Sequence, residues 1–455
     1  MSRLLISAAH KSSGKTTITL GLCAALAERG LAVQPFKKGP DYIDPMWLGM
    51  AAGRPCFNLD FYCMSHPEIL TTVGQRSMTA DISLIEGNKG LYDGLDLEGS
   101  NSNAALAKLT NTPVVLVLDA RGMTRGIAPL ILGNQAFDPD VRIVGVILNQ
   151  LGGSRHEAKL RAVIQHYTDV PVLGGVHRNR ELEITERHLG LIPSNEETSS
   201  LLRIGQIRNI INDHVDIDGL LSVCGKAPLD FEPPSARQAV SGERVRIGIA
   251  RDAVFGFYYP DDLEALVQSG AELVTINTLE DRNLPEIEGL FIGGGFPETH
   301  MEALQANTAL RHRIRDAISK GLPAYAECGG LMYLSRSLSW KGTRCEMVGV
   351  IPGDIIMHER PQGRGYVRLC ETSRLPWSEV NPQVEFAAHE FHYSSLENIT
   401  GPLTYALDVR RGTGIDGKHD GIVINNLVAG YSHLRDTRQH RWANRFVDFV
   451  RRHGR

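Results

Sequence analysis

The stretch RLLISAAHKSSGKTT, residues 3–17, places an apolar run directly before a Gly-Lys-Thr-Thr sequence. A buried strand that leads through such a loop into a helix is the context in which a phosphate-binding loop forms. Backbone N–H groups and the helix N-terminus hold phosphate oxygens in these loops. We therefore predict that Gly14, Lys15, Thr16 and Thr17 bind ATP, with the Lys15 ammonium on the β- and γ-phosphates and the Thr16 hydroxyl on Mg²⁺.

The sequence pattern leaves alternatives open for the roles of Ala9 and Asn149, two residues near this loop. The first glycine of the GxxxxGK[ST] pattern is replaced by Ala9, which fits only if its backbone keeps a negative φ angle. Asn149 ends a later apolar run, where it would either contact the adenine or serve as a turn residue. For the loop as a whole, the alternative is a Gly-Lys helix start that binds no ligand.

The N-terminal half alternates nearly continuous apolar runs with helical patterns. Such runs are typical of strands that are buried on both faces of a parallel sheet. One helical pattern covers residues 16–30 and ends at Gly30, which suits a left-handed C-cap. The alternation predicts a doubly wound α/β fold. The apolar runs are RLLISAA (3–9), AVQPFK (32–37), ISLIEG (82–87), PVVLVLDA (113–120) and RIVGVILN (142–149).

A second α/β series follows a break in the pattern. Residues 225–243 combine glycine, proline, serine and charge without an apolar period, which predicts a linker. We therefore expect one domain over residues 1–224 and another over 244–455, the latter richer in short strands from about residue 345. The strand-like runs of the second series are VRIGIA (245–250), AELVTIN (271–277), GLFIGGG (289–295) and PAYAEC (323–328).

Composition narrows the function classes. A chain of 455 residues is long enough for two or three domains, and 42% apolar with 22% charged residues is ordinary globular usage. A net charge of −4 provides no basic field for nucleic acid. We see neither an apolar run of the roughly 18 residues that a membrane span needs nor a secretion signal, so we expect a cytoplasmic protein without a membrane partner. The seven cysteines are scattered without a CxxC pair, which favours neither disulfides nor zinc.

Acidic residues follow the predicted strands of the first half. Asp41 and Asp44 come just after the second run, Glu86 ends the third, and Asp93 lies beyond it. The carboxyl ends of parallel strands line the ligand crevice of an open α/β sheet, and oxygen ligands are what Mg²⁺ prefers. We predict that Thr16, Asp41 and Glu86 hold Mg²⁺. The alternative for each acid is a helix cap or a bond to loop backbone.

Lysines share these loops. Lys37, Lys38 and Lys89 would either bind an anionic substrate or remain solvated.

The stretch AYAECGGLMYL, residues 324–334, contains one cysteine between a strand pattern and two glycines. A tight turn there would push the Cys328 side chain out of the sheet, as in a nucleophile elbow, and the alternative is an inert core cysteine. A thiolate that attacks an acyl carbon requires a base and an oxyanion hole. His433 is available as the base, and the turn at Gly294 and Gly295 could supply backbone N–H groups.

These motifs together resemble the cobyrinic acid a,c-diamide synthase family over essentially the whole chain. The resemblance implies an N-terminal domain similar to dethiobiotin synthetase and a C-terminal class I glutamine amidotransferase domain of the cobyric acid synthase type. In that family ATP and Mg²⁺ convert carboxylates c and a of the tetrapyrrole to acyl phosphates, and ammonia from glutamine displaces phosphate. The matching motifs are FKKGPDYID (36–44), IEGNKGLYDG (85–94), ERHLGL (186–191), FGFYYPDDL (255–263), GGGFPE (293–298), AECGGLMYL (326–334) and HEFHYS (389–394).

The resemblance also implies roles for residues. In the second domain, Cys328 forms the glutamyl thioester and His433 raises its reactivity; this half works as a dyad, so no third acid is assigned. HEFHYS is not HExxH, and we do not expect it to bind a metal.

In the first domain, Asp41 and Glu86 correspond to the acids around Mg²⁺ and phosphoryl transfer. Asp44 and Asp93 correspond to positions near the substrate carboxylate.

Two alternatives remain at this stage. Asn88 and Lys89 stand where corrinoid enzymes usually carry small or apolar residues, so sirohaem or a related sirohydrochlorin is the alternative acceptor. A partitioning-type P-loop switch ATPase is the alternative from another class, although His10 occupies the place of its signature lysine. The expected partners are small molecules, and the oligomeric state is open, with a homodimer as one alternative.

Overall fold

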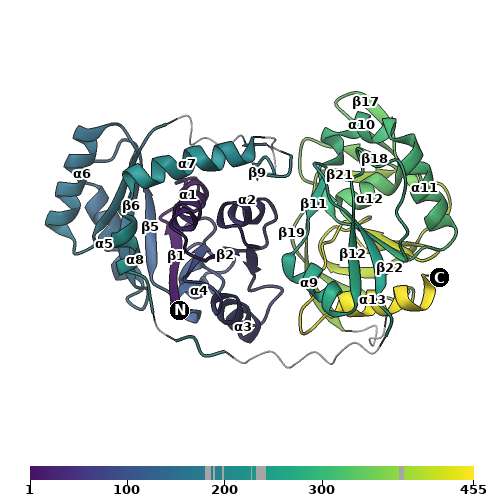
Figure 1. Ribbon diagram of the computed structural model, residues 1–455, viewed down its shortest axis with the longest axis horizontal. Helices are drawn as coiled ribbons and strands as arrows, with labels where there is room; N and C mark the ends of the chain where they lie inside the picture. Colours follow the sequence, from purple (N-terminus) through teal and green to yellow (C-terminus); the bar gives the residue numbers. More distant parts are fainter. Residues whose placement is uncertain are drawn as a thin grey trace. The chain divides into compact units, whose positions relative to one another are not determined.

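The structure is a computed structural model of residues 1–455. It describes residues 1–179, 186–187, 190–196, 199–226, 228–231, 242–378 and 384–454. The chain divides into two compact units, Met1–Ser235 and Ala236–Arg455 (Figure 1). The boundary between the units falls within the segment expected to be a linker, residues 225–243, and most of that segment lies outside the described residues. Within the described residues, no helix combines the length and apolarity needed to span a bilayer.

The first unit is built on a seven-stranded sheet with the order β3-β2-β4-β1-β5-β6-β7, in which every neighbouring pair is parallel. The predicted doubly wound parallel sheet is confirmed. Its strands are β1 (Ser2–Ala8), β2 (Val33–Lys38), β3 (Phe57–Leu59), β4 (Ile82–Glu86), β5 (Val114–Asp119), β6 (Ile143–Leu151) and β7 (Val172–His177), and a separate pair comprises β8 (Glu186–Arg187) and β9 (Gly190–Leu191). Its helices are α1 (Lys15–Glu28), α2 (Ile43–Ala52), α3 (His66–Ser77), α4 (Asn103–Leu109), α5 (Ile127–Phe137), α6 (Ser154–Tyr167), α7 (Ser200–His214) and α8 (Ile217–Ser222).

The five apolar runs predicted as strands correspond to β1, β2, β4, β5 and β6. The strands β3 and β7 were not predicted, because β3 has only three residues and β7 carries two glycines that weaken a strand signal. Helix α1 ends as expected, since Gly30 follows it with a φ of 80°. In Figure 1, α1 lies beside α7, and a side chain at Gly21 would collide with Ile211, so the glycine permits this close packing.

The second unit is built on a nine-stranded mixed sheet with the order β12-β10-β13-β15-β24-β23-β22-β19-β20. Its parallel half runs from β12 to β24, and the rest is antiparallel. Its strands are β10 (Val245–Ala250), β12 (Ala271–Ile276), β13 (Gly289–Ile292), β15 (Ala324–Glu327), β19 (Gly363–Glu371), β20 (Glu385–His392), β22 (Thr404–Arg411), β23 (His419–Ile424) and β24 (Leu427–Gly430).

Two smaller sheets and six helices complete the described part of this unit. One sheet contains β11 (Phe255–Phe257) and β14 (Gly294–Gly295), and the other contains β16 (Ser335–Trp340), β17 (Thr343–Glu346), β18 (Ile351–Met357) and β21 (Ser394–Glu397). The helices are α9 (Pro260–Gln268), η2 (Pro297–Thr299), α10 (Met301–Ala306), α11 (Thr308–Ser319), α12 (Gly329–Leu334) and α13 (Trp442–His453).

The core of the second unit shows how β15 presents its side chains. Ala324 and Ala326 belong to the apolar cluster that includes α11 and α12, whereas Tyr325 belongs to the cluster that includes α13. This division follows from the alternation of side chains across a strand. Glu327 therefore falls on the face of Tyr325, at the carboxyl end of the strand, directly before Cys328.

Candidate active sites

The phosphate-binding loop lies between β1 and α1 and is braced by a side chain from β6. Ser12 and Gly14 have φ angles of 64° and 87°. The Asn149 amide donates a hydrogen bond to the Ser13 carbonyl at 2.9 Å. A Cβ atom on Gly14 would lie 2.1 Å from that amide nitrogen, so only glycine fits there. Ala9 is not among the residues with positive φ, which confirms the expectation for this position.

Lys15 and Thr16 begin α1, with Thr17 next in the first turn. Lys15 is 7% exposed, and its pKa is lowered to about 8, mainly by burial, while the charge of Glu86 opposes that effect. The Thr16 hydroxyl donates to Oε1 of Glu86 at 2.6 Å and lies 3.3 Å from Oδ2 of Asp44. The helix start is thus linked to the acids that the sequence analysis selected.

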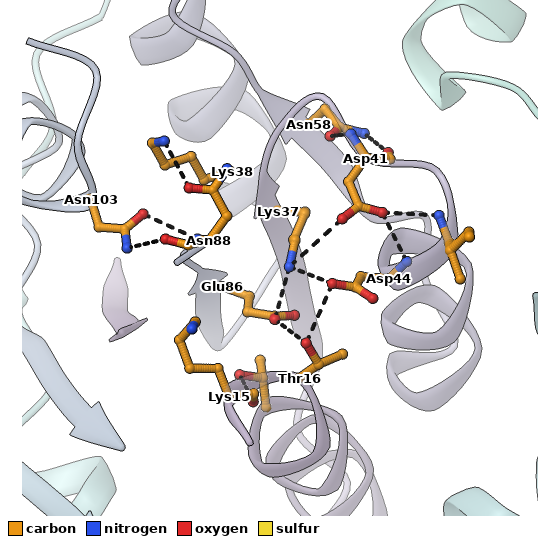
Figure 2. Close-up of polar contacts among 12 residues, drawn as sticks. Lys15, Thr16, Lys37, Lys38, Asp41, Asp44, Asn58, Glu86, Asn88 and Asn103 are labelled. Carbon is orange, nitrogen blue, oxygen red and sulfur yellow. Dashed lines mark hydrogen bonds and ion pairs between the residues drawn. The ribbon is translucent and has the colours of Figure 1, made fainter. Parts of the chain in front are cut away.

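Three of those acids surround a single buried ammonium group. The Lys37 Nζ atom lies 2.5 Å from Asp44, 2.9 Å from Glu86 and 3.9 Å from Asp41, as Figure 2 shows. Burial lowers the pKa of Lys37, but the charges of Asp44, Glu86 and Asp41 outweigh it, so the pKa lies well above its ordinary value. Asp41 comes from the loop after β2, Asp44 from the first turn of α2 and Glu86 from the end of β4, and the pairing of β2 with β4 brings them together.

Asp41 binds the backbone at the start of α2 and also faces Lys37. Its Oδ1 atom accepts hydrogen bonds from the N–H groups of Ile43 and Asp44, at the start of α2, while Oδ2 faces Lys37. The side chain of Asn58 holds the Asp41 backbone through two hydrogen bonds (Figure 2). Burial and the charge of Asp44 raise the pKa of Asp41 to about 7.

Glu86 provides the observation that tests a metal at this cluster. It is fully buried, burial raises its pKa, and no group of the described residues donates a hydrogen bond to its Oε2 atom. An unused carboxylate oxygen beside a threonine hydroxyl and two further carboxylates suits a hard cation such as Mg²⁺. Among the described residues, no group of three or more His, Cys, Asp or Glu side chains is arranged to hold a metal ion alone. The residues present fit Mg²⁺ only with help from other oxygens, such as those of a nucleotide.

Asp93 lies in a turn of its own. Its Oδ2 atom accepts the N–H of Gly90 at 2.8 Å, next to Lys89, whose φ is 50°. This contact is the loop-backbone role that the sequence left as an alternative, although the charge of Asp93 still acts on Lys15.

Lys38 leaves β2 on the face opposite to Lys37 (Figure 2). Its ammonium donates to Oδ1 of Asn88 at 3.0 Å, and Asn103 holds the Asn88 backbone through two hydrogen bonds. Burial lowers the pKa of Lys38 to about 8. Lys37 and Lys38 are only 3% and 5% exposed, so the solvated alternative is wrong for both. The sequence analysis missed Asn103, whose position at a helix start is its only signal.

The second unit contains the predicted elbow. Cys328 follows β15 with φ 48° and ψ −101°, a backbone conformation that non-glycine residues rarely adopt, and α12 begins at the next residue. The Cys328 N–H donates to the Gly430 carbonyl at 2.7 Å, which ties the turn to β24. Strain of this kind persists where surrounding structure enforces it, and it is concentrated at functional sites.

His433 meets the thiol from the loop after β24. Its ring is hydrogen-bonded to Cys328, and its Nδ1 atom lies 3.2 Å from Oε2 of Glu327. Burial lowers the pKa of His433, but these bonds to Cys328 and Glu327 raise it to about 10. The structure therefore brings the predicted nucleophile and base into hydrogen-bond contact, beside a carboxylate to which the sequence analysis gave no role.

The glycine turn lies against this pair, as predicted. A Cβ atom on Gly294 would lie 2.6 Å from Cε1 of His433, and one on Gly329 would lie 2.8 Å from the Gly295 nitrogen. Both close approaches require glycine.

The HEFHYS motif contributes His389, which lies in β20. The rings of His389 and His433 stack with their centroids 5.5 Å apart. Burial and the charge of His433 lower the pKa of His389 to about 3, which keeps it neutral. Of the motif ERHLGL, residues 188 and 189 lie outside the described residues.

The two units match two known domain families. Residues 5–192 match the CobQ/CobB/MinD/ParA nucleotide binding domain, and residues 246–439 match the CobB/CobQ-like glutamine amidotransferase domain. A nucleotide-binding domain joined to a glutamine amidotransferase domain is therefore the class of protein that the fold and sites define.

Relatives identify the family. The chain is 47% identical over 458 residues to the cobyrinate a,c-diamide synthase of Magnetococcus marinus, covering 99% of this chain and 98% of the relative. It is 41% identical to the proteins of that name from Methanosarcina acetivorans (98% of this chain, 95% of the relative) and Archaeoglobus fulgidus (98% and 96%). The chain belongs to the cobyrinate a,c-diamide synthase family, which confirms the predicted resemblance.

Proposed function

We propose that this protein converts the a and c carboxylates of cobyrinate to amides, using ATP and glutamine, as a carbon–nitrogen ligase of cobalamin biosynthesis. The observation that carries the proposal is the presence of two complementary sites in one chain of this family. One unit has a phosphate loop beside a carboxylate cluster, and the other has a thiol–imidazole pair on a strained elbow. The two sites are complementary, because one would supply ammonia and the other would activate the carboxylate that the ammonia attacks.

In the second unit, the pair would release ammonia from glutamine. The Cys328 thiolate adds to the amide carbon of the glutamine side chain. The carbon–nitrogen bond then breaks as the His433 imidazolium gives its proton to the departing nitrogen, which leaves a glutamyl thioester and ammonia. Water, losing a proton to His433, hydrolyses the thioester to glutamate and restores the thiolate–imidazolium pair.

Gly294 and Gly295 are the proposed oxyanion hole. Their turn lies against both His433 and the start of α12, which supports the proposal that their backbone N–H groups would face the oxygen of the attacked amide. Such donors stabilise the negative oxygen that forms in the transition state.

In the first unit, a carboxylate of the tetrapyrrole would attack the γ-phosphorus of ATP. ADP departs and an acyl phosphate forms; ammonia then adds to the acyl carbon, phosphate leaves, and the nitrogen loses a proton to give the amide. Gly14, Lys15, Thr16 and Thr17 bind the nucleotide, and Lys15 balances the phosphate charge.

Thr16, Asp41 and Glu86 would hold Mg²⁺ together with phosphate oxygens. The cation, when bound, neutralises charge on the β- and γ-phosphates. Lys37 holds Asp41 and Glu86 close together, since its ammonium group is paired with both carboxylates.

Asp44 and Asp93 are proposed to lie near the substrate carboxylate. Asp44 adjoins the Thr16 hydroxyl at the phosphate loop, and the turn of Asp93 carries Lys89. Lys89 bears on the choice of tetrapyrrole, because an added cation suits an acceptor with more peripheral carboxylates. Sirohaem and related sirohydrochlorins remain the alternative acceptors.

The test is an endpoint assay with ATP, Mg²⁺ and glutamine in which cobyrinate and sirohaem are offered in parallel and the products are weighed by mass spectrometry. Two replacements of a hydroxyl by an amino group on cobyrinate are expected. Turnover of sirohaem alone would contradict the corrinoid assignment, and no amidation of either would contradict the ligase assignment. Because the reaction consumes ATP and glutamine, we also expect the protein to work in the cytoplasm.

A further inference from the structure

Glu327 is a buried carboxylate that the reaction described above does not use. It is 3% exposed, and both of its oxygens are occupied. Oε1 accepts hydrogen bonds from the Tyr325 hydroxyl at 2.6 Å and from the Leu434 N–H at 2.9 Å, while Oε2 lies 3.2 Å from Nδ1 of His433. Two hydrogen bonds to Oε1 therefore fix the carboxylate in the orientation in which Oε2 faces the imidazole of His433.

These contacts define the state of the His433 ring. Two donors already point at Oε1, so the carboxylate acts as an acceptor, and the contact at Oε2 is an Nδ1–H donor. With Nδ1 engaged by Glu327, the Nε2 atom is left for the Cys328 thiol. A carboxylate on one imidazole nitrogen sets the tautomer and orientation of the ring, and it favours the imidazolium form.

We propose that Glu327 is a positioning residue of the glutamine-hydrolysing site, supplying through His433 the acid that completes a Cys–His–Glu arrangement. The inference rests on the proposed function of the second unit. Glu327 and Cys328 are consecutive in the chain, yet they reach the same imidazole. This is possible because the left-handed backbone at Cys328 redirects the thiol, and because β24, which leads to His433, is the neighbour of β15.

Other buried carboxylates near the site are occupied elsewhere. Glu390 accepts the backbone N–H groups of residues 413 and 414, and Asp420 accepts those of residues 421, 431 and 432. The titratable groups that face His433 are Cys328 and Glu327 from the end of β15 and the neutral His389 from β20. Burial and the charge of Glu327 both raise the pKa of the Tyr325 and Tyr258 phenols, so these two groups stay protonated.

No proton passes to or from Glu327 during the proposed reaction. The proton moves between His433 and the departing nitrogen, and then between water and His433. Glu327 stabilises the positively charged His433 ring at two stages: before His433 gives its proton to the departing nitrogen, and after His433 takes a proton from water. Loss of its charge should therefore slow turnover and weaken glutamine binding little.

The first experiment compares Glu327→Gln with the unchanged protein in two assays. The kcat of glutamine hydrolysis should fall by about 10³-fold with KM little changed, because the variant keeps the shape of the side chain and loses its charge. Amidation supplied with free ammonia should be unchanged. In addition, the pH dependence of the rate at which iodoacetamide alkylates Cys328 should shift in Glu327→Gln, because the His433 imidazolium beside the thiolate loses its proton more readily. An unchanged kcat and an unchanged alkylation profile would overturn the proposal.

A second buried Glu–His pair in the same unit provides a matched control. Glu371 lies 2.9 Å from Nε2 of His440 and also binds Arg445. Glu371→Gln should lower stability without displacing the pH profile of alkylation at Cys328. If both variants changed this profile equally, Glu327 would be a structural residue only.

Two further variants separate the possible failures. Glu327→Asp keeps the carboxylate and should recover part of the kcat that Glu327→Gln loses. It also replaces Glu327→Gln in the test if that variant does not fold. A loss of kcat in Glu327→Asp as large as that in Cys328→Ser would overturn the positioning role. Cys328→Ser should abolish glutamine hydrolysis. If it did not, the proposed function of the unit would fail, and the role of Glu327 would fail with it.

Discussion

The two sites differ in how they balance their charges. At the thiol, the acid, imidazole and nucleophile come from the chain itself, and hydrogen bonds already connect them. At the phosphate loop, three carboxylates converge on the ammonium of Lys37, and one oxygen of Glu86 has no hydrogen-bond partner in the part of the chain that the structure describes. The first site is assembled before any ligand arrives. In the second, three carboxylates share one ammonium group, and under the proposed function Mg²⁺ and ATP would supply further positive charge and oxygen ligands.

The largest expected effect tests whether the assembled site serves ammonia supply alone. Cys328→Ser should reduce glutamine-dependent amidation by about 10³-fold or more, because the thioester cannot form. Amidation with free ammonia should stay within about twofold of the unchanged protein, since the phosphate-loop site keeps all of its residues. Steady-state rates with each nitrogen source measure both quantities. Loss of the ammonia-dependent reaction would show that Cys328 also serves the other site or the fold.

The next prediction concerns the charge balance at the phosphate loop. Lys37→Met should lower the free energy of unfolding by about 3 kcal/mol, because three carboxylates are left together without their counter-ion. Added Mg²⁺ should restore part of this loss in the variant. Urea denaturation with and without Mg²⁺ provides the measurement.

A surface ion pair provides the matched control. Lys108 lies 2.6 Å from Asp138 with 42% of its side chain exposed. Lys108→Met should change stability by no more than about 0.5 kcal/mol, with no response to Mg²⁺. Equal effects of the two substitutions would contradict a charge-balanced cluster around Lys37.

The third prediction uses the pKa of His433. Because its pKa in the folded protein is raised from 6.5 to about 10, its contribution to stability is fully present below pH 6.5 and is lost as the pH rises through 10. The unchanged protein should therefore lose roughly 3–4 kcal/mol more than His433→Gln between pH 7 and pH 10. Thermal denaturation across this range measures the difference. Parallel curves would show that the imidazolium is not stabilised in the folded protein.

The smallest expected effect concerns the substrate side of the phosphate-loop unit. Lys89 adopts a φ of 50°, which glycine tolerates without strain. Lys89→Gly should thus change stability by less than about 1 kcal/mol while raising the KM of the tetrapyrrole by less than about tenfold. Lys341→Gly, at another lysine with a φ of 49°, should leave that KM unchanged. An unchanged KM in both variants would remove Lys89 from the substrate site.

Much of each site could be predicted because its residues stand next to strong local signals. Lys15 follows a glycine at the start of a helix, and Cys328 stands between a strand and two glycines, so chain neighbours alone place both side chains. Glu86 was selected because it ends an apolar run. Partners that approach across the sheet were harder to predict. Lys37 could have been a solvated lysine, and Glu327 was passed over although a carboxylate in an apolar strand is itself a signal of a buried partner.

The sequence by itself determined the two α/β series, the phosphate loop, the nucleophile elbow and the family. Those features depend on the order of residues within short segments, where backbone conformation and side-chain direction follow from neighbours in the chain. Tertiary structure alone decided that Asn149 braces the loop, that Lys37 joins the acids and that Glu327 reaches His433. These contacts depend on which strands become neighbours, because the order of strands in a sheet sets which carboxyl ends meet.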